Sequence, residues 1–226
     1  MQKDNLDPQL SISFIKHSFH QINLNKSPIR IFHNYLLKEI EIHGKTIDLG
    51  SGTHSSYHNF LNKKKIELFF ADKFHSKEKN FYKIDLENSL KLDDHSFDTV
   101  LLFNVLEHVR NHKNLINEIY RILKPGGKFE IFVPFMHRYH EDPLDVFRPT
   151  HRYLEDLLKS NDFKVKTSLV GVGPFVVISE ILLRYFRFKF LKKFLFLIFL
   201  LLNKFSKFFS KDYQTYYLGI HCSCRK

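Results

Sequence analysis

Short apolar segments alternate with segments of helical periodicity along the middle of the chain. Helices are expected at about 54–63 and 112–123. Strands are expected at 45–49, 66–71, 81–85, 98–104 and 128–133. Strands that alternate with helices at this spacing predict βαβ units and a mostly parallel sheet. Ligands of such sheets bind beyond the carboxyl ends of the strands.

The flanking regions complete the expected domain. Residues 1–27 show no sustained period and are expected to form an N-terminal arm or lid. Residues 28–226 are expected to form a single domain. It would begin with a helix over 29–42 and end with a helix over 151–160, capped by Thr150, and two strands, 163–170 and 216–226.

The run TIDLGSGTH at 46–54 places Asp48 at the end of a strand and two glycines in the following turn. Glycines let the backbone approach a ligand closely, and a helix start offers free N–H donors. The third glycine of a dinucleotide-binding turn is replaced by His54, which crowds a diphosphate but tolerates an amino-acid carboxylate. A dehydrogenase is therefore the weakest of the alternative functions.

Acidic residues follow the next two expected strands. Asp72 ends IELFFAD, about twenty residues after the glycine turn, where a carboxylate can accept both hydroxyls of a ribose. Asp85 and Leu86, in YKIDLE, are placed to read an exocyclic amine and to cover a purine face. The buried segment FDTVLLF then leads to Asn104.

These segments, with FDTVLLFNVLEHV and RILKPGGKFEIFVP, stand in the same order and spacing as in class I S-adenosylmethionine-dependent methyltransferases. Over about residues 45–135 the chain resembles the type 11 methyltransferases. That group includes quinone-biosynthesis enzymes and bacterial enzymes of cell-surface glycan and lipid loci. The resemblance implies S-adenosylmethionine as cofactor. It also implies an α/β, Rossmann-like, doubly wound, mostly parallel seven-stranded sheet with an antiparallel last strand.

The resemblance also implies contacts for individual residues. Asp48, Gly50 and Gly52 would line the methionine moiety, and Asp72 would hold the ribose. The adenine would meet Asp85 and Leu86, and the sulfonium side would meet Asn104. The remaining expected cofactor contacts are neighbours of these residues, namely Ser51, Lys73, Val105 and His108. His54 departs from the family, which usually has a third glycine there.

The loop after the fifth long strand is rich in groups that could serve a second substrate. It carries His137, His140, Asp142, Asp145, Arg148 and His151. A similar pattern occurs in the glycan-locus methyltransferases that the chain resembles. We expect His140 to act as base or substrate anchor, and Asp145 and Arg148 to form a pair that shapes the pocket. The alternative is a structural salt bridge with exposed histidines.

A metal is not expected at Glu107 and His108. Some quinone-type relatives bind a divalent ion through this pair and a carboxylate three positions earlier. In this chain the earlier position is Asn104, a poorer ligand.

The segment 175–211 is expected to be a Phe- and Lys-rich helical insertion before the last strand. Its uncharged core, 194–203, is about half of what a bilayer-spanning helix requires. Flanking Lys and Arg residues favour a helix that lies on an anionic membrane surface through residues 184–211. The alternative is packing on the domain or on a second copy as a homodimer.

The net charge of +11 leaves a nucleic-acid partner open, but the charge is concentrated beside apolar residues. We therefore expect a small-molecule, glycan or lipid-linked acceptor. An RNA methyltransferase or a non-catalytic scaffold are the alternatives. The N-terminus lacks the pattern of a secretory signal, and Cys222 and Cys224 are too close for a normal disulfide. Both observations favour the cytoplasm, at the inner face of the membrane if one is bound.

Overall fold

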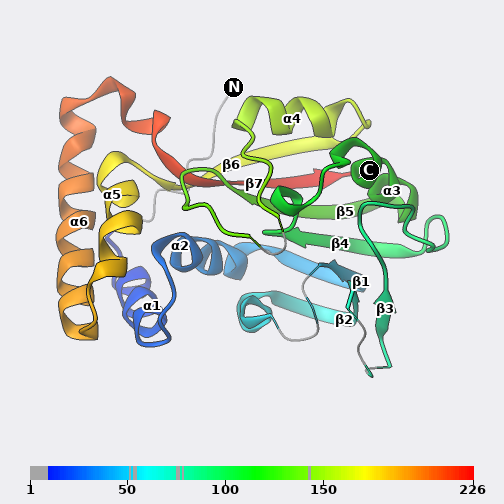
Figure 1. The fold of residues 1–226 in the computed structure, drawn as a ribbon, viewed down its shortest axis with the longest axis horizontal. Coiled ribbons are helices and arrows are strands. Elements are labelled where there is room, and N and C mark those ends of the chain that lie inside the picture. Colours follow the sequence, from blue (N-terminus) through cyan, green and yellow to red (C-terminus); the bar gives the residue numbers. More distant parts are fainter. Residues whose placement is uncertain (1–9, 51, 53–54, 75–76, 78, 142–143) are drawn as a thin grey trace. The chain divides into compact units, whose positions relative to one another are not determined.

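The computed structural model describes residues 10–50, 52, 55–74, 77, 79–141 and 144–226. These residues form one seven-stranded sheet with the strand order β3-β2-β1-β4-β5-β7-β6 (Figure 1). The strands are β1 (Glu41–Leu49), β2 (Asn62–Asp72), β3 (Phe81–Lys83), β4 (Phe97–Phe103), β5 (Leu123–Pro134), β6 (Lys164–Val172) and β7 (Tyr217–Arg225).

The sheet is parallel from β3 to β5, and β7 runs against it. The pairs β1–β2, β1–β4, β2–β3 and β4–β5 are all parallel. Along β5 and β7, the amide of Phe135 donates to Leu218 O, whereas the amide of Lys226 donates to Gly127 O. Residue numbers thus rise along β5 in the direction in which they fall along β7, so the two strands are antiparallel. The predicted fold class, including the antiparallel last strand, is confirmed.

The chain divides into two compact units. The helical unit comprises residues 1–39, 134–138 and 168–220, and the β unit comprises residues 40–133, 139–167 and 221–226. This division does not follow the boundary expected between residues 27 and 28. The expected arm and single domain stay a prediction.

The β unit is built around strands whose side chains are buried on both faces. Val100, Leu101 and Leu102 of β4 are 0% exposed, as the near-continuous apolar run predicts for a central parallel strand. The helical elements of the unit are η2 (Ser56–Phe60), η3 (Leu106–His108), α3 (His112–Ile122) and α4 (His151–Lys159). Thr150 caps α4, because its hydroxyl accepts from the amide of Tyr153 at 3.3 Å.

The helix expected at about 54–63 is wrong. Its first residue, His54, lies outside the described residues, and the rest of the segment forms only η2 before β2 begins at Asn62. Tyr57 and His58 of η2 turn inward to hydrogen-bond Asp48. These contacts fix η2 against the end of β1, and β2 already begins at Asn62. The segment between them is therefore too short for a regular helix.

The helical unit collects α1 (Ile12–Asn23), α2 (Pro28–Leu36), η1 (Leu37–Glu39), α5 (Pro174–Leu182), η4 (Leu183–Tyr185), α6 (Lys189–Phe209) and η5 (Lys211–Thr215). In this unit α6 packs on α5 and α1. Phe32 of α2 packs against both α1 and α6. Its ring centroid lies 5.1 Å from that of Phe14 and 6.2 Å from that of Phe196. The helix expected over 29–42 is shorter in the structure. Helix α2 ends at Leu36, η1 follows it, and β1 begins at Glu41.

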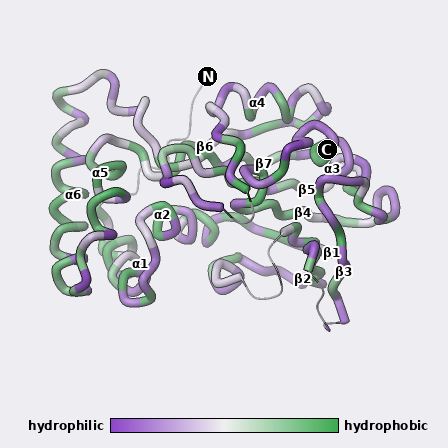
Figure 2. The backbone as a smooth tube through the Cα atoms, in the orientation of Figure 1, coloured by the Kyte–Doolittle hydropathy of each residue, from purple (hydrophilic) through white to green (hydrophobic). Residues whose placement is uncertain are grey.

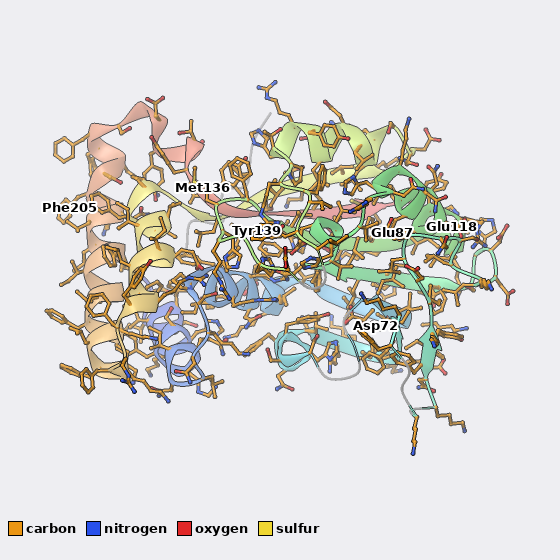
Figure 3. The ribbon with its side chains drawn as sticks, in the orientation of Figure 1. Asp72, Glu87, Glu118, Met136, Tyr139 and Phe205 are labelled. Atoms are coloured by element: carbon orange, nitrogen blue, oxygen red, sulfur yellow. The ribbon has the colours of Figure 1, made fainter. Side chains whose placement is uncertain are left out.

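Helix α6 has one buried face and one exposed apolar face. Phe196, Leu200 and Asn203 are buried, and the side-chain amide of Asn203 fixes the helix by donating to Val172 O at 2.9 Å. On the opposite side lies an exposed apolar stripe at helical spacing, made of Phe190, Phe194, Leu201, Phe205 and Phe208. Figure 2 shows the hydrophobic colour along most of α6, and in Figure 3 the labelled Phe205 points away from α5.

Helix α6 is nevertheless not a membrane span. Within the described parts of the chain, no helix combines the length and the apolar character that crossing a bilayer requires.

Candidate functional site

A cavity of about 540 Å³ opens at the carboxyl ends of β1 to β4, within the β unit. The residues that line it follow the ends of these four strands or belong to the loop after β5. They are Gly50, Gly52, Asp72, Lys73, Phe74, Ile84, Asp85, Leu86, Glu87, Asn104, Val105, His108, Val109 and Leu144. Nine of the eleven expected cofactor contacts are in this set.

The turn after β1 requires glycine. Gly50 has a φ of +75°, and a Cβ added there would lie 2.7 Å from a methyl of Val105 and 3.3 Å from one of Leu86. Its amide donates to Ala71 O at 2.6 Å, which ties the turn to the end of β2. The backbone therefore forms part of the cavity wall, where a ligand can approach it closely.

Asp72 stands at the end of β2 on the cavity wall (Figure 3). Its Oδ2 accepts from the amide of Gly52 at 3.1 Å, and its Oδ1 accepts from the amide of Phe74 at 3.3 Å. Two backbone donors thus orient the carboxylate, and each oxygen has a further lone pair for a ligand hydroxyl.

Asp85 lies just after β3 and is held by its own turn. Its Oδ1 accepts from the amide of Glu87, and its Oδ2 accepts from the side chain of Asn88, both at 3.1 Å. Leu86, 9% exposed, is an apolar part of the same wall. The pair presents one polar and one apolar surface to the cavity, and its expected contact with adenine stays a prediction.

Asn104 adopts a left-handed backbone conformation, with a φ of +57°. Its amide donates to Phe132 O at 2.9 Å, which keeps β4 and β5 paired up to the cavity. Its side-chain Nδ2 is buried and has no hydrogen-bond partner among the described residues. A buried donor at a cavity wall is costly unless a ligand or water satisfies it, so Asn104 marks a polar binding position.

Asp48 is not among the lining residues. Its side chain is 0% exposed, and its Oδ2 accepts from the hydroxyl of Tyr57 and from Nε2 of His58, both at 2.6 Å. Its Oδ1 has no partner among the described residues. The expected contact of Asp48 with the methionine moiety stays a prediction, and the expected contact Ser51 lies outside the described residues.

The loop after β5 brings His140, Asp145 and Arg148 together. Asp145 Oδ2 accepts from the amide of His140 at 2.9 Å and from Arg148 at 2.5 Å, and lies 3.3 Å from His140 Nδ1. The ring of His140 meets that of His108 edge to face at 5.1 Å. His140 therefore lies next to a lining residue, although none of these three loop residues lines the cavity.

The other acidic and histidine residues noted in that part of the sequence are not part of this group. Asp142 lies outside the described residues. His137 belongs to the helical unit, where its Nδ1 lies 3.2 Å from Glu180. His151 is the first residue of α4.

Glu107, His108 and His140 place ligand-type atoms within 4.8 Å of one another, a spacing that could hold a metal ion. One contact weighs against a cation, because the guanidinium of Arg148 lies 3.4 Å from His140 Nδ1. The hydrogen bond between His108 Nδ1 and Leu144 O does not, since metal-binding histidines commonly donate one ring nitrogen to a carbonyl. The absence of a metal stays a prediction.

Comparison with known proteins fits this geometry. Residues 48–131 match the family described as "Methyltransferase domain". A probable S-adenosylmethionine-dependent methyltransferase of Mycolicibacterium smegmatis is 31% identical over 86 residues, which are 35% of this chain and 34% of that protein. The chain carries a class I S-adenosylmethionine-dependent methyltransferase domain.

Further relatives agree with this methyltransferase domain. A sterol 24-C-methyltransferase of Aspergillus fumigatus is 30% identical over 91 residues, which are 40% of this chain and 21% of that protein. The chain thus spans about a third or less of these two relatives. A SAM-dependent methyltransferase from Archaeoglobus fulgidus has the same fold, with a TM-score of 0.54, 18% identity and coverage of 96% of this chain and 100% of that one.

Sequence reasoning missed several lining residues of the methyltransferase domain: Phe74, Ile84, Glu87, Val109 and Leu144. Four of them lie within two residues of an expected contact, so a wider window around each strand end would have included them. Leu144 is next to Asp145, which was expected to shape the substrate pocket and not to contact the cofactor. It reaches the cavity because the loop after β5 folds back, with the amide of Val146 donating to Glu107 O at 2.9 Å.

Proposed function

We propose that the chain is a methyltransferase that moves the methyl group of S-adenosylmethionine to a small-molecule, glycan or lipid-linked acceptor at a membrane surface. The observation that carries the proposal is the shared cavity. Asp72, Asp85 and Asn104 follow three different strands, yet all line the same space.

The polar groups present fit this cofactor. Asp72 would hold the ribose hydroxyls, and Asp85 with Leu86 would hold the adenine. Gly50 and Gly52 would line the methionine moiety, and Asn104, whose buried Nδ2 has no partner among the described residues, would flank its sulfonium side. When bound, the cofactor supplies a methyl carbon already activated by a sulfonium. The chain's own task is then alignment of donor and acceptor.

Calorimetry with S-adenosylmethionine tests the cofactor site. The wild-type protein is expected to bind, and Asp72→Ala to lose most of the affinity. Asp93→Ala removes an exposed carboxylate outside the cavity and is the matched control. A well-folded wild-type protein that does not bind would favour the scaffold function instead.

His140 is proposed as the base or substrate anchor. Asp145 accepts a hydrogen bond from the backbone of His140, and its carboxylate lies 3.3 Å from His140 Nδ1, so the loop holds the imidazole in place beside the lining residue His108. A base is needed only if the acceptor must lose a proton. His140→Gln is expected to lower methyl transfer while leaving the affinity for S-adenosylmethionine unchanged.

The exposed apolar stripe of α6 supports the membrane part of the proposal. Phe190 is 82% exposed and Phe208 is 77% exposed, and lysines such as Lys192 and Lys204 share the helix. Exposed aromatic residues with flanking cations suit the headgroup region of an anionic leaflet at the inner face of a membrane.

Flotation with vesicles of phosphatidylcholine and phosphatidylglycerol tests this face. Phe190→Asp with Phe205→Asp is expected to abolish flotation. Ile12→Asp, at another exposed apolar position of the helical unit, is expected to leave it intact. A wild-type protein that ignores vesicles but forms dimers through α6 would favour self-packing.

Transfer of a radiolabelled methyl group to fractionated cell extract addresses the acceptor. Label in the lipid or glycan fraction supports the proposal. Label confined to RNA would favour the RNA methyltransferase alternative, which the net charge of +11 supports.

A further inference from the structure

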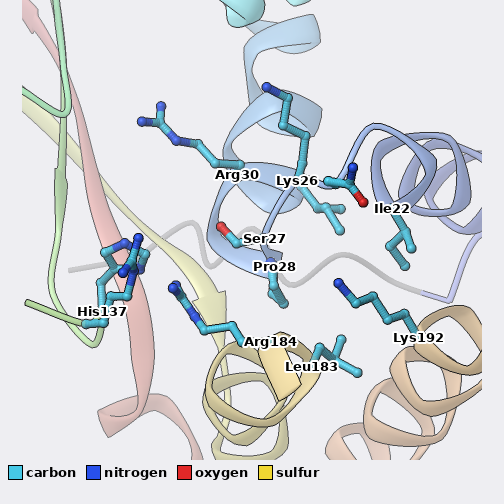
Figure 4. A pocket seen from close by; sticks show the side chains of 12 residues that line it. Ile22, Lys26, Ser27, Pro28, Arg30, His137, Leu183, Arg184 and Lys192 are labelled. Atoms are coloured by element: carbon cyan, nitrogen blue, oxygen red, sulfur yellow. The ribbon is translucent and has the colours of Figure 1, made fainter. Parts of the chain in front are cut away.

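A second cavity, of about 450 Å³, lies within the helical unit. Four separate segments line it: the stretch from the end of α1 into α2, the chain just after β5, η4, and α6 (Figure 4). No expected cofactor contact and none of the three expected catalytic residues is part of it.

The lining is strongly cationic. Among the described residues that line the cavity, five besides His137 carry an ammonium or guanidinium group, and none carries a carboxylate. The five are Lys26, Arg30, Arg138, Arg184 and Lys192. In Figure 4, Lys192 extends from α6 towards Pro28, and Arg184 extends from η4 towards the side of His137.

One buried carboxylate organises part of this cluster. Glu180, 2% exposed, contacts Nδ1 of His137 at 3.2 Å, pairs with Arg184, and accepts from the amide of Ile29 at 2.9 Å. Burial alone would raise the pKa of Glu180, but these hydrogen bonds outweigh it and hold the pKa below its usual value. Glu180 therefore stays ionised and positions two of the lining side chains, those of His137 and Arg184.

The start of α2 borders the cavity, where Glu180 already accepts from the amide of Ile29. Pro28 opens the helix, and the side chain of the N-cap residue Ser27 makes no capping hydrogen bond. The first turn of a helix carries partial positive charge, and Ser27 and Pro28 both line the cavity.

From this lining we infer that the cavity binds a phosphate group, as carried by a phospholipid headgroup or by a soluble phosphate ester. Arg and Lys side chains converging from several segments can match the several acceptor oxygens of a phosphate dianion better than the two of a carboxylate. The site lies within the helical unit and does not depend on the proposed methyl transfer.

Two variants of equal charge change test the inference. Arg30→Gln/Lys192→Gln removes two lining cations from α2 and α6. Lys16→Gln/Lys38→Gln removes two exposed cations from α1 and η1 that do not line the cavity. Thermal unfolding verifies that both variants fold. Calorimetry with inorganic pyrophosphate is expected to show binding for the wild-type and control proteins, and at least about tenfold weaker binding for the lining variant.

Binding to vesicles distinguishes a lipid headgroup from a soluble phosphate ester as the ligand. Phosphatidylcholine vesicles with or without phosphatidic acid are offered to the same three proteins. If the lining variant loses pyrophosphate binding and the preference for phosphatidic acid, the site takes a lipid headgroup. If it loses pyrophosphate binding alone, the site takes a soluble phosphate ester.

Two results would overturn the proposed phosphate site. A wild-type protein that binds neither pyrophosphate nor phosphatidic acid, or a lining variant that binds both as the control does, overturns the inference. Binding of S-adenosylmethionine, measured on the same samples, separates this failure from failure of the proposed function.

Discussion

The backbone amide of Gly52 donates a hydrogen bond to Oδ2 of Asp72 at 3.1 Å. This contact joins the turn after β1 to the end of β2, twenty positions apart in the sequence. Since both residues line the cavity, the carboxylate that would hold a ribose is oriented by the loop that would hold the amino-acid part.

We predict that Asp72→Asn weakens the binding of S-adenosylmethionine by roughly 10- to 150-fold, because hydrogen bonds to a charged acceptor contribute about 1.5–3 kcal/mol. Calorimetry measures the change. Asp93→Asn, which alters an exposed carboxylate, should bind as the wild type does. Equal affinities for all three proteins would remove Asp72 from the cofactor site.

His17 provides a pH-dependent element of stability. Burial, assisted by the positive charge of Lys38, lowers the pKa of His17 to about 4, although its Nε2 hydrogen-bonds Ile31 O at 3.1 Å. The unfolded chain takes up this proton near pH 6.5, before the folded protein does. The folded state therefore loses stability as pH falls from about 6.5 to about 4, on the order of 3 kcal/mol in total. NMR titration of the ring should give a midpoint near 4, and one near 6.5 would refute the effect.

Cys222 and Cys224 should be unreactive in the native protein. Both are free and 0% exposed. Burial raises the pKa of Cys222 to about 12 and that of Cys224 well above its usual value, so neither forms the reactive thiolate at neutral pH. Mass spectrometry after iodoacetamide treatment should find both thiols unlabelled until urea unfolds the chain. Rapid labelling of the native protein would show that β7 opens.

Divalent metal should not stabilise the protein. Glu107, His108 and His140 have the spacing of a metal site, but the Arg148 guanidinium beside His140 opposes a further cation. We expect the melting temperature to be the same with EDTA and with Mn²⁺. A Mn²⁺-dependent rise that disappears in His140→Ala would show that the cluster binds metal.

The sequence located the strand-end positions of the β unit well. Asp72, Asp85 and Asn104 each follow a short apolar run, and parallel strands bring their carboxyl ends to one edge. Local pattern and chain order were sufficient there, since each residue's position depends mainly on its own strand.

What the sequence did not predict depends on contacts between distant segments. The helix expected at about 54–63 is reduced to η2, because Tyr57 and His58 hydrogen-bond Asp48 at the end of β1. The cationic cavity was missed for the same reason. Lys26, Arg138 and Lys192 lie far apart in the chain and become one lining only when the helical unit folds.

The central claim is that four successive strand ends hold one S-adenosylmethionine molecule. Hydrogen–deuterium exchange with and without this ligand tests it most directly. The account predicts slower exchange in the peptides that cover residues 48–52, 72–74, 84–87 and 104–109, all from the cavity region, and unchanged exchange in α4. Unchanged exchange in all four peptides at saturating ligand, or protection confined to the helical unit, would contradict it.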